Sequence, residues 1–358
     1  MGLIRFLLAF AVLLGHSPTA TFKFIHAGTA VQAFFVVSGF YMALVLDGKY
    51  NDTKLFYSNR LLRLAPAYFT MMVIAAIALF GFGVTATSTL GIFENVFTNP
   101  WSAVVMAFEN VFVIGQHLLY WFMLDENGSL VFDPYGGLPS ETRSVSWQAL
   151  LVPQSWSLSI ELMFYALAPW LAKRHLRTIL GIAAFSIGLR FAGHWLPVEF
   201  PLWQGRLFST ALFMFLFGML AYRAMPLVER LPAIAHWTVG GALALFLVFL
   251  PMTGWSGPVQ SWLIYVCVAI GTPFAFCATS DNRFDRWIGE LSYPIYLTHL
   301  VVIAAVLIYE IPLPTWSTIL FTLILSAAIL QFVERPVDRW RQERARRSGA
   351  AEATPETA

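Results

Sequence analysis

The stretch Gly2-Leu-Ile-Arg5-Phe-Leu-Leu-Ala-Phe-Ala-Val-Leu-Leu-Gly-His16 is apolar except for one arginine and one histidine. On a helix, the eleven-residue step from Arg5 to His16 leaves a net offset of roughly 20° and an axial separation of about 16 Å. Both side chains therefore lie on one face. An ionisable group at membrane depth is costly unless it faces protein or water, so this face predicts a functional site. The alternative is that Arg5 flanks the membrane and His16 reaches the lipid headgroups.

The composition indicates that lipid is the main solvent of this chain. Of its 358 residues, 58% are hydrophobic and 12% are charged, whereas soluble domains carry about 25% charged residues. The net charge is +2 and the basic residues form short clusters between apolar runs, so we expect no nucleic-acid partner. Cys267 and Cys277 would lie about 80° apart on one helix, so we expect them to pack as free thiols and expect no metal site.

Eleven apolar runs approach the roughly 20 residues that a membrane-spanning helix requires. We expect the run 101–118 to be re-entrant or interfacial, because it holds four polar residues. Leaving it out places the basic cluster at 173–177 and most other Lys and Arg in the cytoplasm, as the positive-inside rule requires. The ten remaining runs are 3–17, 28–46, 65–84, 154–171, 177–195, 206–223, 236–252, 260–278, 288–309 and 315–333.

The sequence therefore predicts an all-α polytopic membrane protein with about ten transmembrane helices and both termini in the cytoplasm. Residues 1–338 would form a single membrane domain, with the segment from about 85 to 153 outside the cell. We expect 339–358, basic and then small and polar, to be a disordered cytoplasmic tail that touches anionic lipid. The basic residues left at or near the outer side are Lys23, Arg143, Arg190 and Arg206.

Two arginines on the cytoplasmic side form a candidate anion site. Arg60 and Arg63 are three residues apart and share a helix face. Guanidinium groups bind phosphate oxygens in pairs, and Arg5 would end at the same membrane surface. The alternative is that all three are ordinary cytoplasmic flanking charges.

A carboxylate lies inside a predicted span. Trp156-Ser157-Leu-Ser-Ile-Glu161-Leu-Met-Phe-Tyr165 places Glu161 about two turns below the outer end of its helix, where it requires a partner. It either takes part in a polar site or pairs with another buried polar group for structural reasons.

Other polar residues mark two further helices. Ser292, Tyr296 and His299 fall on one stripe of a long apolar helix, which must face a cavity or a polar partner. Hydrogen bonding between helices would also explain this stripe. In Phe34-Phe-Val-Val-Ser38-Gly39-Phe40, the small residues suggest a close contact between helices.

From Arg5 to about Pro336, the chain resembles the acyltransferase-3 family of integral-membrane acyltransferases. Each motif alone is weak, but six in order are specific. They are the Arg5 to His16 spacing, Phe34 to Phe40, Arg60-Leu-Leu-Arg63-Leu-Ala-Pro66, Trp156 to Tyr165, Ser292 to His299, and Glu334-Arg-Pro336.

The resemblance implies a multi-pass enzyme of the bacterial inner membrane that moves an acyl group, usually acetyl, from cytoplasmic acyl-CoA to a hydroxyl at the outer face. Arg5, Arg60 and Arg63 would hold the coenzyme A phosphates. His16 would be the general base, and Glu161 would orient its imidazole or bind the acceptor. The residues expected to line the substrate or polar cavity are Ser38, Trp156, Ser157, Tyr165, Ser292, Tyr296 and His299.

The acceptor expected from the resemblance is a carbohydrate or glycolipid of the cell envelope, such as an exopolysaccharide. Partners would be the lipid bilayer and either further copies of this chain or other proteins of glycan biosynthesis. Direct transfer and transfer through an acyl-histidine are both open. The main alternative is a membrane carrier or flippase for a glycolipid or small metabolite, and a scaffold subunit of an export complex is a third interpretation.

Overall fold

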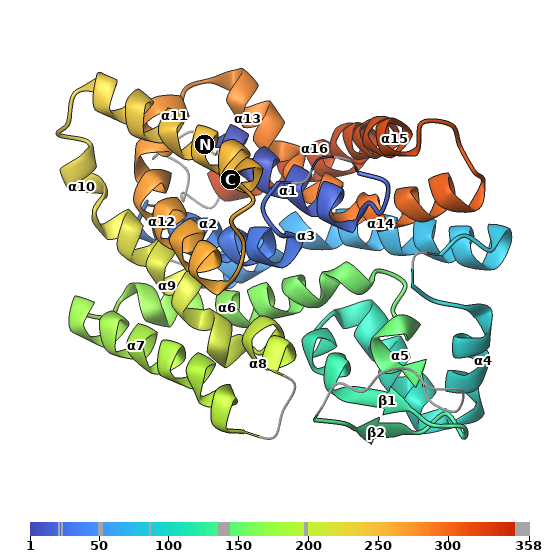
Figure 1. The fold of residues 1–358 in the computed structure, drawn as a ribbon. Coiled ribbons are helices and arrows are strands. Elements are labelled where there is room, and N and C mark those ends of the chain that lie inside the picture. Colours follow the sequence, from blue (N-terminus) through green and yellow to red (C-terminus); the bar gives the residue numbers. More distant parts are fainter. Residues whose placement is uncertain are drawn as a thin grey trace.

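The computed structural model describes residues 1–20, 22, 24–48, 53–85, 87–134, 144–196 and 200–347, and most of these are helical (Figure 1). The α-helices are α1 (Gly2–His16), α2 (Ala27–Gly48), α3 (Thr53–Ala76), α4 (Leu90–Thr98), α5 (Pro100–Phe112), α6 (Trp156–Ala172), α7 (Leu176–Ala192), α8 (Phe200–Arg206), α9 (Phe208–Arg223), α10 (Met225–Val228), α11 (Ala233–Phe249), α12 (Pro258–Thr279), α13 (Arg283–Glu290), α14 (Ser292–Ile308), α15 (Pro314–Ile329) and α16 (Arg335–Arg347). Of the residues discussed above, Lys23, Arg143 and 348–358 lie outside the described ranges.

Shorter elements complete the described chain. The 3₁₀ segments are η2 (Gln116–Trp121), η3 (Ser146–Ala149), η4 (Pro153–Ser155), η5 (Gly193–Trp195) and η6 (Leu250–Thr253); the π-helical segments are η1 (Ile77–Gly81) and η7 (Leu330–Glu334). The strands are β1 (Phe122–Leu124), β2 (Leu130–Phe132) and β3 (Ser144–Val145), which form an antiparallel sheet in the order β2-β1-β3.

Each of the ten predicted spans falls on a helix. Seven helices of the described part are long and apolar enough to cross a membrane; they are Ala27–Asp47, Thr53–Gly81, Leu176–Trp195, Ala233–Thr253, Pro258–Thr279, Arg283–Ile308 and Pro314–Arg344. The helices α1 and α9 are apolar but shorter, and α6 has 17 residues. The expected all-α polytopic membrane fold is therefore confirmed, while the orientation of the termini stays a prediction.

The helix α2 lies at the centre of the bundle and packs against α1, α6, α9 and α12. Two glycines permit its approach to α9. A Cβ on Gly39 would lie 1.9 Å from the carbonyl oxygen of Phe215, and a Cβ on Gly218 would lie 1.9 Å from that of Val36. The backbones of α2 and α9 thus touch at this crossing, which is the close helix contact expected from the small residues around Ser38.

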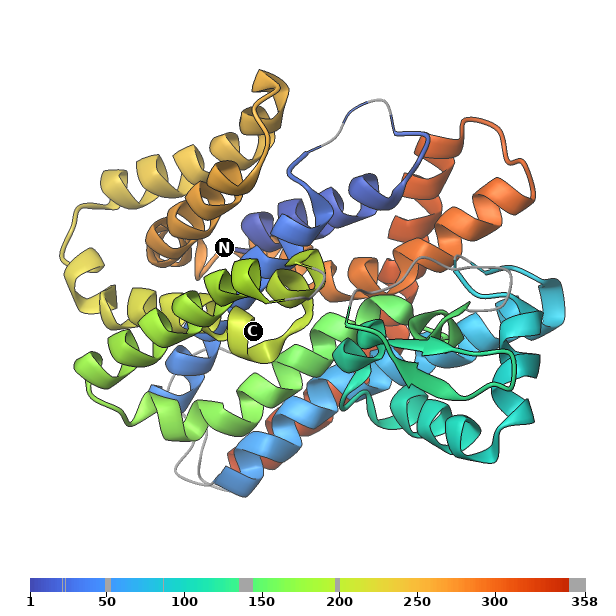
Figure 2. The ribbon, with the colours of Figure 1, turned by 60° about the horizontal axis from the view of Figure 1, so that its bottom comes forward.

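The segment between α3 and α6 packs at one end of the molecule, beside the long helices rather than among them (Figures 1 and 2). The run 101–118 is not one helix, because α5 ends at Phe112 and Val113 and Gly115 have positive φ. Its polar residues fasten the segment to the bundle. The Tyr68 hydroxyl donates to the carbonyl oxygen of Asn110 at 2.6 Å, and Ser159 Oγ lies 2.9 Å from His117 Nδ1. This segment is absent from the candidate spans, as expected for a run that does not cross.

The C-terminal region differs from the prediction, because α16 carries the helix on to Arg347 instead of becoming disordered at 339. Contacts with α3 explain the difference. Arg341 Nη1 donates to the carbonyl oxygen of Asn59 at 3.3 Å, and Arg344 Nη2 donates to Ser58 Oγ and to Asn59 Oδ1 at 2.6 Å each. The basic residues that suggested a solvated tail thus order the helix.

Candidate functional site

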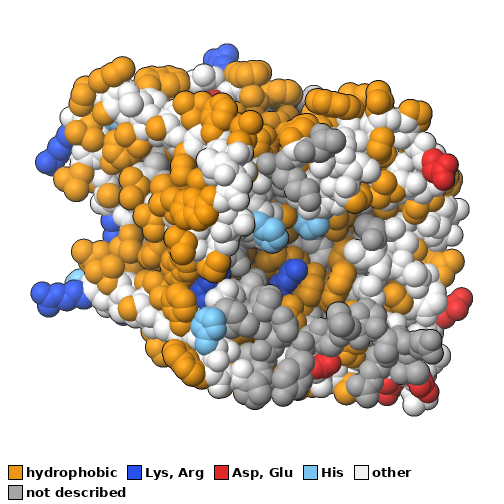
Figure 3. Space-filling view, viewed as in Figure 1, with side chains coloured by type: hydrophobic (Ala, Val, Ile, Leu, Met, Phe, Trp, Pro, Cys, Tyr) orange, Lys and Arg blue, Asp and Glu red, His pale blue; other side chains and the backbone are white. Residues whose placement is uncertain are grey.

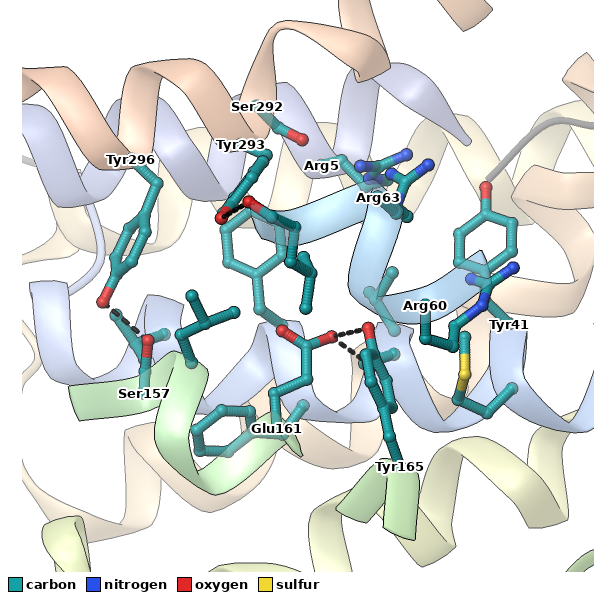
Figure 4. A pocket seen from close by; sticks show the side chains of 18 residues that line it. Arg5, Tyr41, Arg60, Arg63, Ser157, Glu161, Tyr165, Ser292, Tyr293 and Tyr296 are labelled. Carbon is teal, nitrogen blue, oxygen red and sulfur yellow. Dashed lines mark hydrogen bonds between the residues drawn. The ribbon is translucent and has the colours of Figure 1, made fainter. Parts of the chain in front are cut away.

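A cavity of about 830 Å³, including the part open to solvent, lies between α1, α2, α3, α6 and α14 (Figure 4). Nine of the twelve predicted site residues line it; they are Arg5, Ser38, Arg60, Arg63, Ser157, Glu161, Tyr165, Ser292 and Tyr296. The three others, His16, Trp156 and His299, lie beyond its wall. The rest of the lining is mostly apolar, and Tyr41 and Tyr293 also belong to it.

The three arginines gather at one end of this cavity (Figure 4). Arg60 is 2% exposed, and its Nε has no hydrogen-bond partner among the described residues. The guanidinium carbon of Arg5 lies 5.8 Å from the ring centroid of Tyr41, and the charges of Arg5 and Arg63 act on each other. A cluster of like charges is held together at a cost, so an arrangement of this kind suits an anionic ligand.

Glu161 lies beside these arginines. Its Oε1 accepts hydrogen bonds from Ser38 at 2.6 Å and from Tyr165 at 2.5 Å, and its charge acts on Arg63. Figure 4 shows the carboxylate between Tyr165 and the centre of the cavity. Glu161 was expected to orient the His16 imidazole or to bind the acceptor; in the structure its hydrogen-bond partners are the hydroxyl groups of Ser38 and Tyr165.

Two hydroxyl groups form the opposite end of the cavity. Ser157 Oγ lies 2.7 Å from the Tyr296 hydroxyl, which also donates to the carbonyl oxygen of Gln154 at 2.5 Å. The Tyr296 ring lies 5.9 Å from the ring of His299, centroid to centroid. Tyr296 therefore separates the cavity from the histidines beyond it.

His16 and His299 form a pair, with ring centroids 5.1 Å apart. The Nδ1 of His16 lies 2.9 Å from the Val12 carbonyl oxygen, and the Nδ1 of His299 lies 2.7 Å from that of Tyr296. A carbonyl oxygen only accepts, so each neutral ring carries its proton on Nδ1 and presents a lone pair on Nε2. His16 is exposed, whereas His299 is fully buried. Figure 3 shows histidine side chains in a hollow of one face of the molecule, near a Lys or Arg side chain. An exposed imidazole with this tautomer is able to accept a proton.

Arg206, the last residue of α8, was expected only as an outer flanking charge, but it lies beside this pair. Its guanidinium carbon is 3.9 Å from the ring centroid of Tyr120 and 3.8 Å from that of Trp156. Such cation–π contacts contribute about 2 kcal/mol or more each when desolvated. The charge of Arg206 acts on His16 and on Tyr296. The site thus has a cationic cavity on one side of Tyr296 and a histidine and arginine group on the other.

The face of α1 between Arg5 and His16 is not a channel. Ala9 and Val12 occupy this face between them, and both are fully buried against neighbouring helices. Only Arg5 of α1 lines the cavity, whereas seven residues of α2 do so. The cavity between the arginines and Tyr296 is therefore lined mainly by α2 and α6, not by the shared face of α1.

Four residues of the site escaped the sequence analysis. Tyr41 and Tyr293 lie in apolar runs and carry no signal that separates them from packing tyrosines. Arg206 was visible as one of few outer cations. Glu334, in the Glu-Arg-Pro signature, lines a small cavity with Arg63, and its Oε1 is buried without a hydrogen-bond partner among the described residues.

Comparison with known proteins identifies the family of this chain. The family model described as an acyltransferase domain, of the acyltransferase-3 type, matches residues 1–332 of the chain. No curated protein and no solved structure matches it. With a helical membrane fold and a family match over most of its length, this chain belongs to the acyltransferase-3 family and is a membrane acyltransferase.

Proposed function

We propose that this chain transfers an acyl group, which we expect to be acetyl, from cytoplasmic acyl-CoA to a hydroxyl of a cell-surface or exported polysaccharide or glycolipid. The observation that carries the proposal is one cavity that has Arg5, Arg60 and Arg63 at one end and Tyr296 at the other (Figure 4). The family match supports group transfer over the carrier and scaffold alternatives.

The arginine end fits the phosphates of coenzyme A. Phosphate oxygens accept the paired N–H groups of guanidinium, and the buried, unpartnered Nε of Arg60 is a donor that such an oxygen would satisfy. This end also lies beside the basic helix α16, whose Arg344 bonds to α3. The positive-inside rule supports placing it in the cytoplasm, where acyl-CoA would enter.

The histidine end fits the transfer step. His16 Nε2 would accept the proton of the acceptor hydroxyl as the oxygen attacks the thioester carbonyl carbon. The C–S bond then breaks, the thiolate of coenzyme A takes the proton from the imidazolium, and the acyl group remains on the acceptor as an ester. Transfer through an acyl-histidine would use the same lone pair on Nε2 as the nucleophile.

Glu161 would act on the donor side. It holds the Ser38 and Tyr165 hydroxyls and balances part of the arginine charge. This arrangement favours a role in shaping the donor cavity over direct contact with His16. Ser292, whose hydroxyl donates to the Gly289 carbonyl at 2.7 Å, would form part of the same wall.

The acceptor would bind at the outer end, where the segment between α3 and α6 covers the bundle. Tyr120 and Trp156 provide aromatic surface there, and aromatic side chains with polar neighbours suit sugar rings. A glycan acceptor at the cell surface would also place the protein in a bacterial inner membrane. Its partners there would be glycan-biosynthesis proteins or further copies of the chain.

The test is acyl transfer by the purified protein in proteoliposomes. The probes are radiolabelled acetyl-CoA and surface polysaccharide from the source cells, freed of its esters with mild alkali. We expect label in the polysaccharide with the wild type and a loss of roughly 10²–10⁴-fold with His16→Ala, since general-base catalysis contributes about that factor.

His236→Ala is the matched control. The Nε2 of His236 lies 2.9 Å from the carbonyl oxygen of Val228, so this histidine also bonds to backbone, but it lies on α11 and outside the site. It should keep wild-type transfer. Full transfer by His16→Ala would remove the general-base role, and a wild type without any transfer to glycan would contradict the proposed function.

A further inference from the structure

Arg206 has the features of a group prepared for a negatively charged atom. Its guanidinium carbon lies 3.9 Å from the ring centroid of Tyr120 and 3.8 Å from that of Trp156, and these two rings are inclined at 76° to each other. These contacts fix the plane of the group. Its Nη1 is nevertheless buried without a hydrogen-bond partner among the described residues. A fixed donor left unsatisfied in a desolvated place is costly unless a ligand completes it.

A second caged arginine on the same side shows that the cage alone does not explain this donor. Arg190 lies over Phe213 and Trp262 at 5.6 and 5.9 Å. Its Nη1 donates to the Gln204 carbonyl at 2.6 Å and its Nη2 to Gln32 Oε1 at 3.0 Å. Both Nη atoms of Arg190 are thus used by the protein, which is the pattern of a structural arginine.

The position of Arg206 relative to the reacting groups suggests a ligand for its unpartnered Nη1. The adjacent Trp156 precedes Ser157, which bonds to Tyr296 at the end of the cavity. The charge of Arg206 acts on both His16 and Tyr296. The guanidinium therefore contacts the residue next to Ser157 at the Tyr296 end of the cavity and acts electrostatically on the imidazole of His16.

We propose that Arg206 is a further catalytic residue, whose Nη1 donates a hydrogen bond to the carbonyl oxygen of the acyl thioester as that oxygen becomes negatively charged. The inference rests on the proposed function. When the acceptor oxygen attacks the carbonyl carbon, the π electrons of C=O move onto oxygen and His16 takes the hydroxyl proton. When the C–S bond breaks, that electron pair returns to re-form C=O, and the thiolate leaves with the proton.

The same oxygen carries the charge if His16 attacks first and forms an acyl-histidine, so the role of Arg206 holds for either route. Preorganised donors of this kind act mainly on the transition state, because the charge is absent in the bound substrate. Arg206 should therefore affect turnover more than affinity. A carboxylate on the acceptor would instead be bound in the ground state, and its loss would appear in the acceptor KM.

The experiment compares wild type, Arg206→Gln and Arg206→Lys in the proteoliposome assay with acetyl-CoA and de-esterified polysaccharide. We expect Arg206→Gln to lower kcat by roughly 10²–10³-fold, as for loss of one oxyanion donor, with KM unchanged for both substrates. Arg206→Lys should recover part of kcat. Thermal unfolding and binding of acetyl-CoA, measured on the same samples, establish that each variant is folded and holds its donor.

Arg190→Lys is the matched control, since it alters an arginine that also lies over aromatic rings but whose two Nη atoms donate to protein groups; it should lower thermal stability without changing kcat. Wild-type kcat in Arg206→Gln, or a defect confined to the acceptor KM, would overturn the oxyanion role. Absence of transfer by the wild type would instead overturn the proposed function, so the two failures are distinguishable. If Arg206→Gln does not fold, the kcat of Arg206→Lys decides alone, and an unchanged value overturns the inference.

Discussion

Arg60 and Arg63 share one face of α3 but have different surroundings. Arg60 is almost fully buried over Phe56 with an unsatisfied Nε, whereas Arg63 lies between the large cavity and a smaller one that holds Glu334 and Asp338. Arg63 therefore has acidic neighbours that share its charge, and Arg60 has more to gain from an added anion.

This difference predicts how donor binding depends on each residue. Arg60→Ala should weaken binding of coenzyme A roughly tenfold or more, because a hydrogen bond to a charged group contributes about 1.5–3 kcal/mol. Arg63→Ala should weaken it less, and Arg60→Lys should restore it incompletely because it lacks the planar fork. Titration calorimetry of the purified protein with coenzyme A measures this.

Arg335→Ala is the control for that series, since Arg335 lies in the same basic region but outside the cavity and pairs with Glu290 at 3.5 Å. It should bind coenzyme A as the wild type does. If the Arg60 and Arg63 variants bind coenzyme A with the affinity of the wild type, both residues are flanking charges and not donor-binding residues.

At the scale of elements, the crossing of α2 and α9 tolerates no side chain at Gly39. Gly39→Ala should force the helices apart and lower stability by about 1–3 kcal/mol, as overpacking does. Gly241→Ala, on α11 with nothing within 4 Å of an added Cβ, should leave the midpoint of thermal unfolding unchanged or raise it. Equal midpoints for both variants in detergent would show that the contact is looser than described.

The segment between α3 and α6 should respond to pH through Glu109. Burial raises the pKa of this carboxyl to about 7, and its Oε2 has no partner among the described residues. The unfolded carboxyl has the ordinary value of 4.5, so it releases its proton earlier than the folded one. Stability is therefore complete below pH 4.5 and falls as pH rises toward 7.

Glu109→Gln removes that titration while it keeps the shape. Between about pH 5 and about pH 7.5, the midpoint of thermal unfolding of the wild type should fall relative to that of Glu109→Gln. Burial lowers the pKa of His117 from 6.5 to about 4, so this histidine adds stability as pH rises toward 6.5. Its contribution is the same in both proteins, so the difference between the two curves reports Glu109. Parallel curves for the two proteins would mean that Glu109 is ionised in the folded protein.

At the scale of the whole molecule, the orientation in the membrane is open to a direct test. Asn127 and His175 are both exposed and lie on opposite sides in the ten-span prediction. In a background with Cys267→Ser and Cys277→Ser, Asn127→Cys should react with a membrane-impermeant maleimide added to intact cells. His175→Cys should react only after the cells are opened; the reverse pattern would invert the topology.

The sequence predicted the helical membrane fold because apolar runs and the positions of basic residues are set by the solvent. Nine of the twelve site residues expected from the sequence and its family resemblance line the cavity, as polar side chains inside apolar helices require a common polar space. The sequence did not predict the surroundings of Arg206 or the partners of Glu161. Those depend on which helices face each other, as when η2 brings Tyr120 to α8.

The packed face of α1 has a consequence for the energy supply of the cell. Ala9 and Val12 fill the face between Arg5 and His16 and are fully buried. This packing leaves no space along the helix for a chain of water molecules between the two side chains. Protons and ions are held back there by close packing. Under the proposed function, the free energy of a cytoplasmic thioester would drive formation of the ester outside, without a flow of protons along α1.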